Sequence, residues 1–109
     1  MRVWDIPPEK LCKNHLLGEH NEIHGLWSIL INDKKGYSKH PETLRWKGKL
    51  KALYIRHEKI VNEMEKRNFN HKSPLEKTKA TGGGIQNEFV NTVEEQIQIL
   101  RKKRCNCKV

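Results

Sequence analysis

The chain has 109 residues, the usual size of one domain, which excludes a multidomain enzyme or a barrel of about 250 residues. Charged residues make up 32% and hydrophobic residues 35%, a polar composition that still permits a small folded core. The net charge is +9, and it is uneven: residues 1–33 carry 3 basic and 5 acidic side chains, whereas residues 34–109 carry 19 and 8. A polyanion is the first partner to expect, although a solvated basic surface without a nucleic-acid role is also compatible with this charge.

Membrane and export signals are not evident in the sequence. No stretch approaches the ~18 apolar residues of a membrane span, and residues 1–5 lack the apolar region of a signal peptide, so we expect a cytoplasmic protein. The cysteines, Cys12, Cys105 and Cys107, are odd in number, and Cys105-x-Cys107 lacks the two-residue gap of the common zinc knuckle. This usage predicts free thiols in a reducing compartment.

The first predicted element is a helix that starts near Asp5–Glu9. Pro7 and Pro8 followed by an acid suit a helix N-terminus, where missing N–H groups cost nothing and negative charge meets the helix dipole. From position 11 the apolar residues recur mostly three or four apart and predict a helix to about Ile31: Leu11, Leu16, Leu17, Ile23, Leu26, Trp27, Leu30 and Ile31. Asn32–Gly36 ends it in a turn.

The second predicted helix runs from Pro41 to about Arg67. Its apolar stripe consists of Leu44, Leu50, Leu53, Tyr54, Ile60, Val61 and Met64. Asn68 is a candidate for a left-handed residue after the helix end. Residues 69–90 then form a connection with three consecutive glycines and little periodicity, which is longer than compact domains usually contain unless the loop is functional or mobile.

The third predicted helix begins at a capping-box sequence, residues 91–95, and carries Val93, Ile97 and Leu100 on one face. It runs into a basic cluster whose charges either complement the helix dipole or contact phosphate: Arg101, Lys102, Lys103 and Arg104. Strand-like alternation and internal repeats are not evident. The fold class predicted is therefore all-α, a single compact domain of three main helices joined by loops over residues 1–109.

Three tryptophans, Trp4, Trp27 and Trp46, are the largest apolar side chains. Aromatic residues at helical spacing usually pack into the core, and this is what we expect for all three. A direct contact with DNA is the alternative, and it is most plausible for Trp4.

The first helix also carries the densest set of ionisable side chains. Steps of 100° place His15, Glu19 and Glu22 on one face, and His20 with His24 on another. His20 and His24 have the i, i+4 spacing of a zinc site, but the HExxH order is absent and no third ligand is evident. A carboxylate at Glu22 could act as a general base if partial burial raised its pKa, or could be an ordinary surface glutamate.

Several of these runs together resemble a known family. They are Asn14–Glu22, the pattern Lys49-Leu50-x-x-Leu53-x-x-Arg56 with its continuation Met64-x-x-Arg67-x-Phe69-Asn70-x-Lys72, and the short capped third helix. In this order, over nearly the whole chain, they resemble the phage endonuclease V family of pyrimidine dimer DNA glycosylases. The most specific parts are the His-x6-Glu pattern and the Phe-Asn-x-Lys run.

The resemblance implies an all-α enzyme that recognises cyclobutane pyrimidine dimers in double-stranded DNA, removes the base and then cleaves the abasic site. In that family the nucleophile is the α-amino group of the mature chain, and a first-helix glutamate matching Glu22 is essential. Met1 supplies the amine here, and we expect it to be retained and deformylated because Arg2 is too large for ordinary methionine removal. The implied mechanism is covalent, through an imine, and needs no metal or other cofactor.

The implied DNA contacts fall into two groups. Arg2, His15 and Asn21 line the phosphate and sugar side of the lesion, and the C-terminal basic cluster holds the backbone. Asn21 stands where the best-known member has an arginine, so it can donate a hydrogen bond but not a charge. The chain is expected to act as a monomer.

Two alternatives stay open from the sequence. The first is a DNA-binding module that keeps the scaffold without the chemistry, for which Asn21 is the best argument. The second is a lyase that acts on abasic sites or other lesions with little preference for dimers, because lesion range depends on the shape of a pocket.

Overall fold

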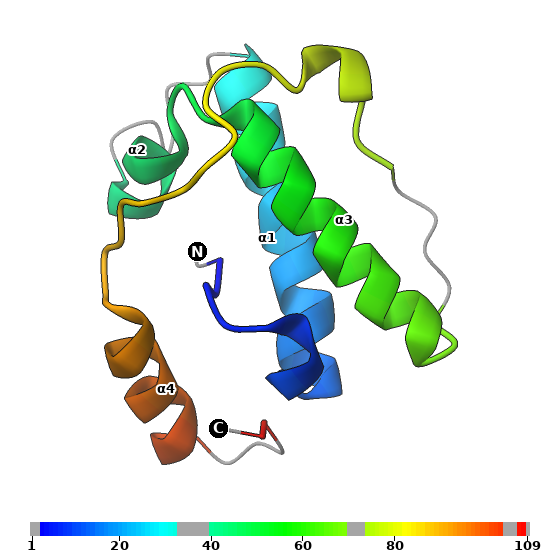
Figure 1. Cartoon of the computed structure of the whole chain (residues 1–109), viewed down its shortest axis with the longest axis vertical. Helices are drawn as coiled ribbons and strands as arrows, with labels where there is room; N and C mark the ends of the chain where they lie inside the picture. The colour runs from blue at the N-terminus through cyan, green and yellow to red at the C-terminus, as the bar shows by residue number, and fades with distance from the viewer. Residues whose placement is uncertain (1–2, 33–39, 70–73, 104–106, 109) are drawn as a thin grey trace.

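The computed structural model describes residues 3–32, 40–69, 74–103 and 107–108. In these ranges it contains helices and no strand: η1 (Pro8–Lys10), α1 (Lys13–Asn32), α2 (Pro41–Trp46), α3 (Leu50–Lys66), η2 (Lys77–Lys79) and α4 (Val93–Lys102) (Figure 1). η1 and η2 are single 3-10 turns, and α2 is short. Three main helices, α1, α3 and α4, remain, which confirms the predicted all-α fold class.

Helices α1 and α3 lie side by side and run in opposite directions through the centre of the molecule (Figure 1). Each turns its apolar stripe toward the other. The side chains buried there are 2% exposed or less: Leu16, Ile23 and Leu26 from α1, and Leu53, Ile60 and Met64 from α3. Burial of each contributes about 1.5–3 kcal/mol, so this stripe makes a large contribution to stability. The three tryptophans are also buried, at 6%, 7% and 2% exposed, which confirms their core role.

The predicted start of the first helix is wrong. The proline-containing segment forms only the 3-10 turn η1, and α1 begins at Lys13. Leu11 ends the turn in an extended conformation (φ −81°, ψ 140°), with its side chain 2% exposed in the core. The chain thus leaves the helical conformation at Leu11, between η1 and α1. The prolines therefore mark a helical N-terminus, as predicted, but that of a single turn.

The second predicted helix is divided into α2 and α3. The break lies at Gly48, whose φ of +75° is a left-handed conformation that glycine adopts without strain. At the far end, Asn68, the second residue after α3, has φ +62°, as predicted for a left-handed residue at a helix end.

The long connection before α4 stabilises the first turn of α3. The N–H groups of Lys51 and Ala52 donate to the carbonyls of Thr81 and Gly83 at 2.8 and 3.1 Å, where the helix has no acceptors of its own. The backbones are in such close contact that a Cβ at Gly82 would overlap the Gly48 carbonyl oxygen. The length and glycine content of this loop thus have a structural cause.

The third predicted helix is confirmed as α4. Thr92 caps it, and the Thr92 hydroxyl and Glu95 carboxylate accept from each other's backbone N–H groups at 3.1 and 2.9 Å. This exchange lowers the pKa of Glu95. α4 is held to the N-terminal segment by Gln96, which is buried and exchanges hydrogen bonds with Asp5 at 2.8 and 2.9 Å.

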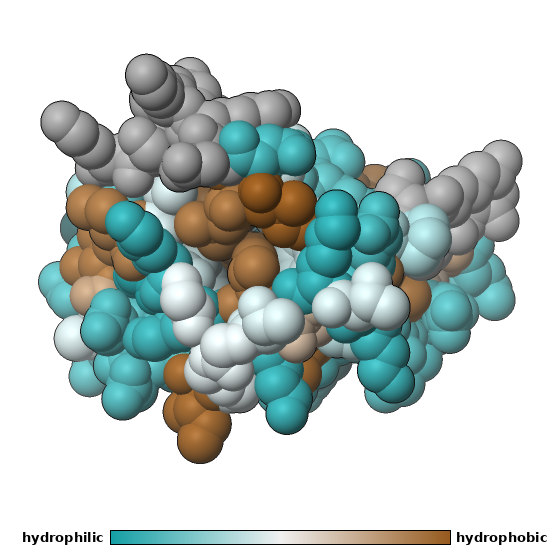
Figure 2. All heavy atoms as spheres, turned by 90° about the horizontal axis from the view of Figure 1, so that it is seen from above, coloured by the Kyte–Doolittle hydropathy of each residue, from teal (hydrophilic) through white to brown (hydrophobic). Residues whose placement is uncertain are grey.

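The surface is mostly hydrophilic on the face seen in Figure 2, where polar side chains surround small groups of hydrophobic ones. Within the described residues, none of the helices has the length and apolar character needed to span a membrane.

Candidate functional site

The N-terminal segment lies along the α1 face that carries His15, Glu19 and Glu22. The Trp4 N–H donates to the Glu19 carboxylate at 2.9 Å, and the Trp4 ring meets the His15 ring edge-on, with 5.8 Å between ring centroids. Val3 is 1% exposed, and its N–H donates to Glu42 of α2 at 3.2 Å. The beginning of the chain is thus fixed to two helices by its own backbone.

A buried ion pair supports this arrangement. Arg56 of α3 contacts both oxygens of Glu19, at 2.6 Å from Nε and 3.0 Å from Nη2, and also donates to the Ile6 carbonyl at 2.9 Å. Burial raises the pKa of Glu19, whereas the Arg56 guanidinium and the Trp4 N–H act to lower it. Sequence analysis placed Glu19 on this face but missed its role as the link between α1, α3 and the N-terminal segment.

Replacing Arg56 with methionine is expected to lower the free energy of unfolding by about 3–5 kcal/mol, because it leaves the Glu19 carboxylate buried without its counter-charge. Urea denaturation followed by circular dichroism measures the change. The double variant Arg56→Met, Glu19→Gln is expected to regain much of the loss, since it buries no unpaired charge. A single-variant loss below about 1 kcal/mol would mean that the pair contributes no more than an exposed one.

A second buried network holds the other side of the segment. Arg45 of α2 bonds to Glu42 at 2.7 Å, to Asp5 at 3.0 Å and to the Val3 carbonyl at 2.9 Å. The Trp46 indole N–H also donates to Glu42, at 3.1 Å. Both networks converge on the few residues that follow the chain start.

Of the two predicted catalytic residues, Met1 and Glu22, the structure describes only Glu22. Glu22 is half-buried on α1, one turn beyond Glu19 on the same face, and Asn21 beside it is exposed. Met1 and Arg2 lie outside the described residues, so the predicted nucleophile has no described position. In the basic cluster, Arg101 and Lys102 end α4 and Lys103 follows it, all three exposed, whereas Arg104 lies outside the described residues.

His15 has surroundings that the sequence analysis did not foresee. Its Nδ1 lies 3.1 Å from the Cys12 sulfur and 3.3 Å from the Cys107 sulfur. Burial, and secondarily the positive charge of Lys103, lowers the pKa of His15 and so disfavours a positive charge on the ring. The i, i+3 spacing of Cys12 and His15 was a usable signal. Cys107 was not, because it lies 92 residues from His15 in the chain.

The predicted histidine pair gains a third member from α3. His57 is fully buried and its Nε2 lies 3.2 Å from the Nε2 of His24, while its Nδ1 lies 3.1 Å from the Glu58 carboxylate. The His20 ring packs on both, with centroids 4.7 Å from His24 and 5.2 Å from His57. A hydrogen-bonded chain from Glu58 through His57 to His24 accounts for this geometry without an ion.

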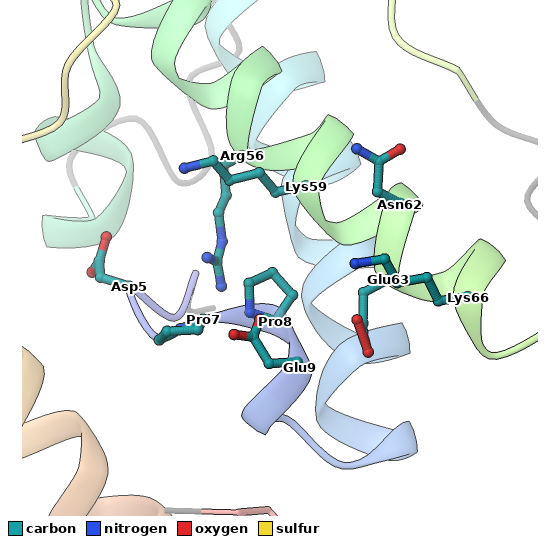
Figure 3. Close-up of a pocket in the computed structure, with 9 residues that line it drawn as sticks. All are labelled: Asp5, Pro7, Pro8, Glu9, Arg56, Lys59, Asn62, Glu63 and Lys66. Atoms are coloured by element: carbon teal, nitrogen blue, oxygen red, sulfur yellow. The ribbon is translucent and has the colours of Figure 1, made fainter.

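An open groove runs between the N-terminal segment and α3 (Figure 3), with the Arg56 side chain reaching from α3 toward the segment. It is lined by Asp5, Pro7, Pro8, Glu9, Arg56, Lys59, Asn62, Glu63 and Lys66. Among the described residues that line it, acidic and basic side chains are equal in number. The described site residues His15, Asn21 and Glu22 are not part of this lining.

These features define a basic, all-α protein whose N-terminal segment is locked against a helix face bearing carboxylates. Residues 1–77 match the family model described as pyrimidine dimer DNA glycosylase. The match covers well over half of the chain, which therefore belongs to the pyrimidine dimer DNA glycosylase family and is a DNA repair glycosylase with DNA as its substrate. No curated protein sequence and no solved structure gives a significant match.

Proposed function

We propose that the protein excises cyclobutane pyrimidine dimers and then cleaves the resulting abasic site, with the α-amino group of Met1 as nucleophile and Glu22 as the acid–base residue. The observation that carries the proposal is the family match over residues 1–77, which includes both groups. The packing of the N-terminal segment on the α1 face of Glu22 supports it.

The backbone that follows the proposed nucleophile in the chain is held in place. The N–H groups of Val3 and Trp4 donate to the carboxylates of Glu42 and Glu19. This anchoring supports the proposal, because restricting the freedom of a reacting group lowers the entropic part of the barrier.

The first reaction replaces the base by the amine. An α-amino group ordinarily has a pKa of about 7.7–8.0, so much more of it is neutral near pH 7 than of a lysine. The neutral amine attacks C1′ of the sugar at the 5′ base of the dimer. The C1′–N bond breaks, and the base leaves with the bonding electrons and gains a proton. Glu22 stabilises the positive charge at C1′. The C1′–O4′ bond then opens, O4′ takes the bonding electrons and the remaining amine proton, and a C1′=N imine is formed.

The second reaction breaks the strand. The imine acidifies the C2′ hydrogen, which Glu22 removes as a general base. The released electrons form a C2′–C3′ double bond, and the C3′–O bond breaks with the phosphate as leaving group. Water then hydrolyses the imine and frees the amine for another turnover.

Recognition on this proposal is by phosphate contact and duplex distortion. A dimer already weakens stacking and pairing, so bending the DNA and displacing a nucleotide costs less there than in intact duplex. Asn21, exposed beside Glu22, can donate a hydrogen bond to phosphate or sugar. Lesion selectivity then needs little reading of base edges.

Cleavage of irradiated and untreated supercoiled plasmid tests the proposal. We expect nicking of the irradiated plasmid alone, and a covalent adduct on an abasic duplex when borohydride reduces the imine. DNA binding without an adduct would show a module that lacks the chemistry. An adduct on abasic DNA without nicking of irradiated plasmid would show a lyase without dimer specificity.

The basic cluster at the end of α4 is expected to contribute affinity without selectivity. Alanine at Arg101, Lys102, Lys103 and Arg104 should weaken binding to damaged and intact DNA alike, and reduce the slope of log K against log salt by about 0.9 for each phosphate that the variant no longer neutralises. Fluorescence anisotropy at several salt concentrations measures the slope, and circular dichroism shows whether α4 stays helical. An unchanged slope would show that these residues do not contact phosphate and only stabilise the C-terminal end of α4 through the helix dipole.

A further inference from the structure

Two cysteines and a histidine from opposite ends of the chain bring three metal-binding atoms together. The Cys12 sulfur, the Cys107 sulfur and the His15 Nδ1 all lie within 4.8 Å of one another. Cys12 directly precedes α1, His15 lies in its first turn, and Cys107 belongs to the C-terminal segment. Cys12 and Cys107 do not form a disulfide with each other.

A single hydrogen bond does not account for both sulfur atoms near the His15 Nδ1. Nδ1 of a neutral imidazole has either one lone pair or one hydrogen, so it can bond to one sulfur at a time. Here both sulfurs lie 3.1–3.3 Å from that one nitrogen. A metal ion placed between the three atoms would bind all of them together.

We propose that Cys12, His15 and Cys107 bind a Zn²⁺ ion that fastens the C-terminal segment to the start of α1. Thiolate and imidazole are common zinc ligands in proteins, with bonds of about 2.3 Å to sulfur and 2.0–2.1 Å to nitrogen. Tetrahedral angles and these bond lengths place sulfur and nitrogen ~3.6 Å apart. The observed distances need to open by only about 0.3–0.5 Å. The fourth coordination position is left to water.

The backbone also joins the two cysteines. The Cys12 N–H donates to the Cys107 sulfur at 3.1 Å, and Cys12 lies at the N-terminal end of α1, where the positive end of the helix dipole attracts negative charge. Two thiols lose their protons on binding, so the ion and its three ligands are neutral together.

The site would position the end of α4. The Lys108 N–H donates to the Lys10 carbonyl at 2.7 Å, so the C-terminal segment already lies beside η1. Cys107 is four residues beyond Lys103 and, like α4, lies outside the range that the family match covers. Zinc would thus fix the basic cluster relative to the helix that bears Glu22. His15 is then a ligand of the ion rather than a contact to DNA.

The test measures metal binding in the full chain, without reference to DNA cleavage. The protein purified under reducing conditions is expected to bind one Zn²⁺ per chain by elemental analysis and to release two protons per ion. Cobalt in its place should show the thiolate-to-metal charge-transfer absorption and the intense visible bands of a tetrahedral site. Cys12→Ser, His15→Asn and Cys107→Ser should each weaken binding by more than about 100-fold, since even losses around the ligands cost 10–100-fold.

His24→Asn is the matched control, because it removes a histidine from the other cluster on α1. It should keep the cobalt–thiolate absorption. Circular dichroism of each variant shows whether α1 and α3 remain folded. A wild-type chain without stoichiometric zinc, cysteine variants that bind cobalt as tightly as wild type, or loss of the thiolate absorption in His24→Asn would each overturn the site.

Hydrogen exchange tests the fastening itself. Chelation of the zinc should speed exchange of the Lys108 amide, which donates to Lys10, and leave the amides in the middle of α1 unchanged. Equal exchange of Lys108 with and without zinc would show that the ion does not hold the C-terminal segment.

Discussion

Replacing Glu22 with glutamine is expected to reduce cleavage of abasic and irradiated DNA by about 10²–10⁴-fold, the usual contribution of a general acid or base. Glutamine has nearly the same shape but can neither remove the C2′ proton nor balance positive charge at C1′. Glu22 is half-buried on α1, and the anchoring carboxylate of this face is Glu19, so the exchange should leave the fold intact. Single-turnover cleavage under saturating enzyme isolates the chemical steps from DNA binding.

The charge change needs a control of its own, because removing an acid from a chain of net charge +9 strengthens phosphate binding. Glu65→Gln, at an exposed position of α3, makes the same change in charge away from α1 and should cleave at the wild-type rate. Wild-type cleavage by Glu22→Gln would refute the role proposed for Glu22.

The helical framework followed from local features of the sequence. Apolar residues three and four apart indicated the buried stripes of α1 and α3, Asn68 marked a helix end, and Thr92 with Glu95 marked a helix start. Each is a property of neighbouring residues, so it can be read without the fold. The break at Gly48 could not, because it depends on the loop around Gly82, 34 residues later, which supplies acceptors to α3.

Of the candidate site, the sequence predicted only which residues share one face of α1, because helix periodicity determines this. Spacing placed His15, Glu19 and Glu22 on one face, and that face does receive the N-terminal segment. The partners that settle what each side chain does come from elsewhere: Arg56 for Glu19, and Cys107 for His15. Such pairings follow from the packing of distant elements, on which residue spacing carries no information.

Blocking the Met1 amine is expected to abolish the borohydride-trapped adduct while leaving DNA binding intact. Acetylation removes the nucleophilic lone pair, and each added residue moves a terminal amine by up to about 3.3–3.6 Å. Misplacement by only ~1 Å can cost on the order of 10²-fold in rate when reacting groups must be aligned. The fold should tolerate either change, because the anchors of the segment are the backbone N–H groups of Val3 and Trp4.

The comparison uses an abasic duplex, with intact mass confirming a Met1 amine that is free in one sample and blocked in the other. Circular dichroism and DNA affinity should agree between the samples, so that only the chemistry differs. Lysine is a poor substitute for the nucleophile, because its ordinary pKa of about 10.4 keeps it protonated at neutral pH unless it is strongly desolvated. Peptide mapping of the adduct should therefore identify the N-terminal peptide. An adduct on an internal lysine, or equal trapping by the blocked protein, would remove Met1 from the mechanism while leaving the family and its DNA substrate unchanged.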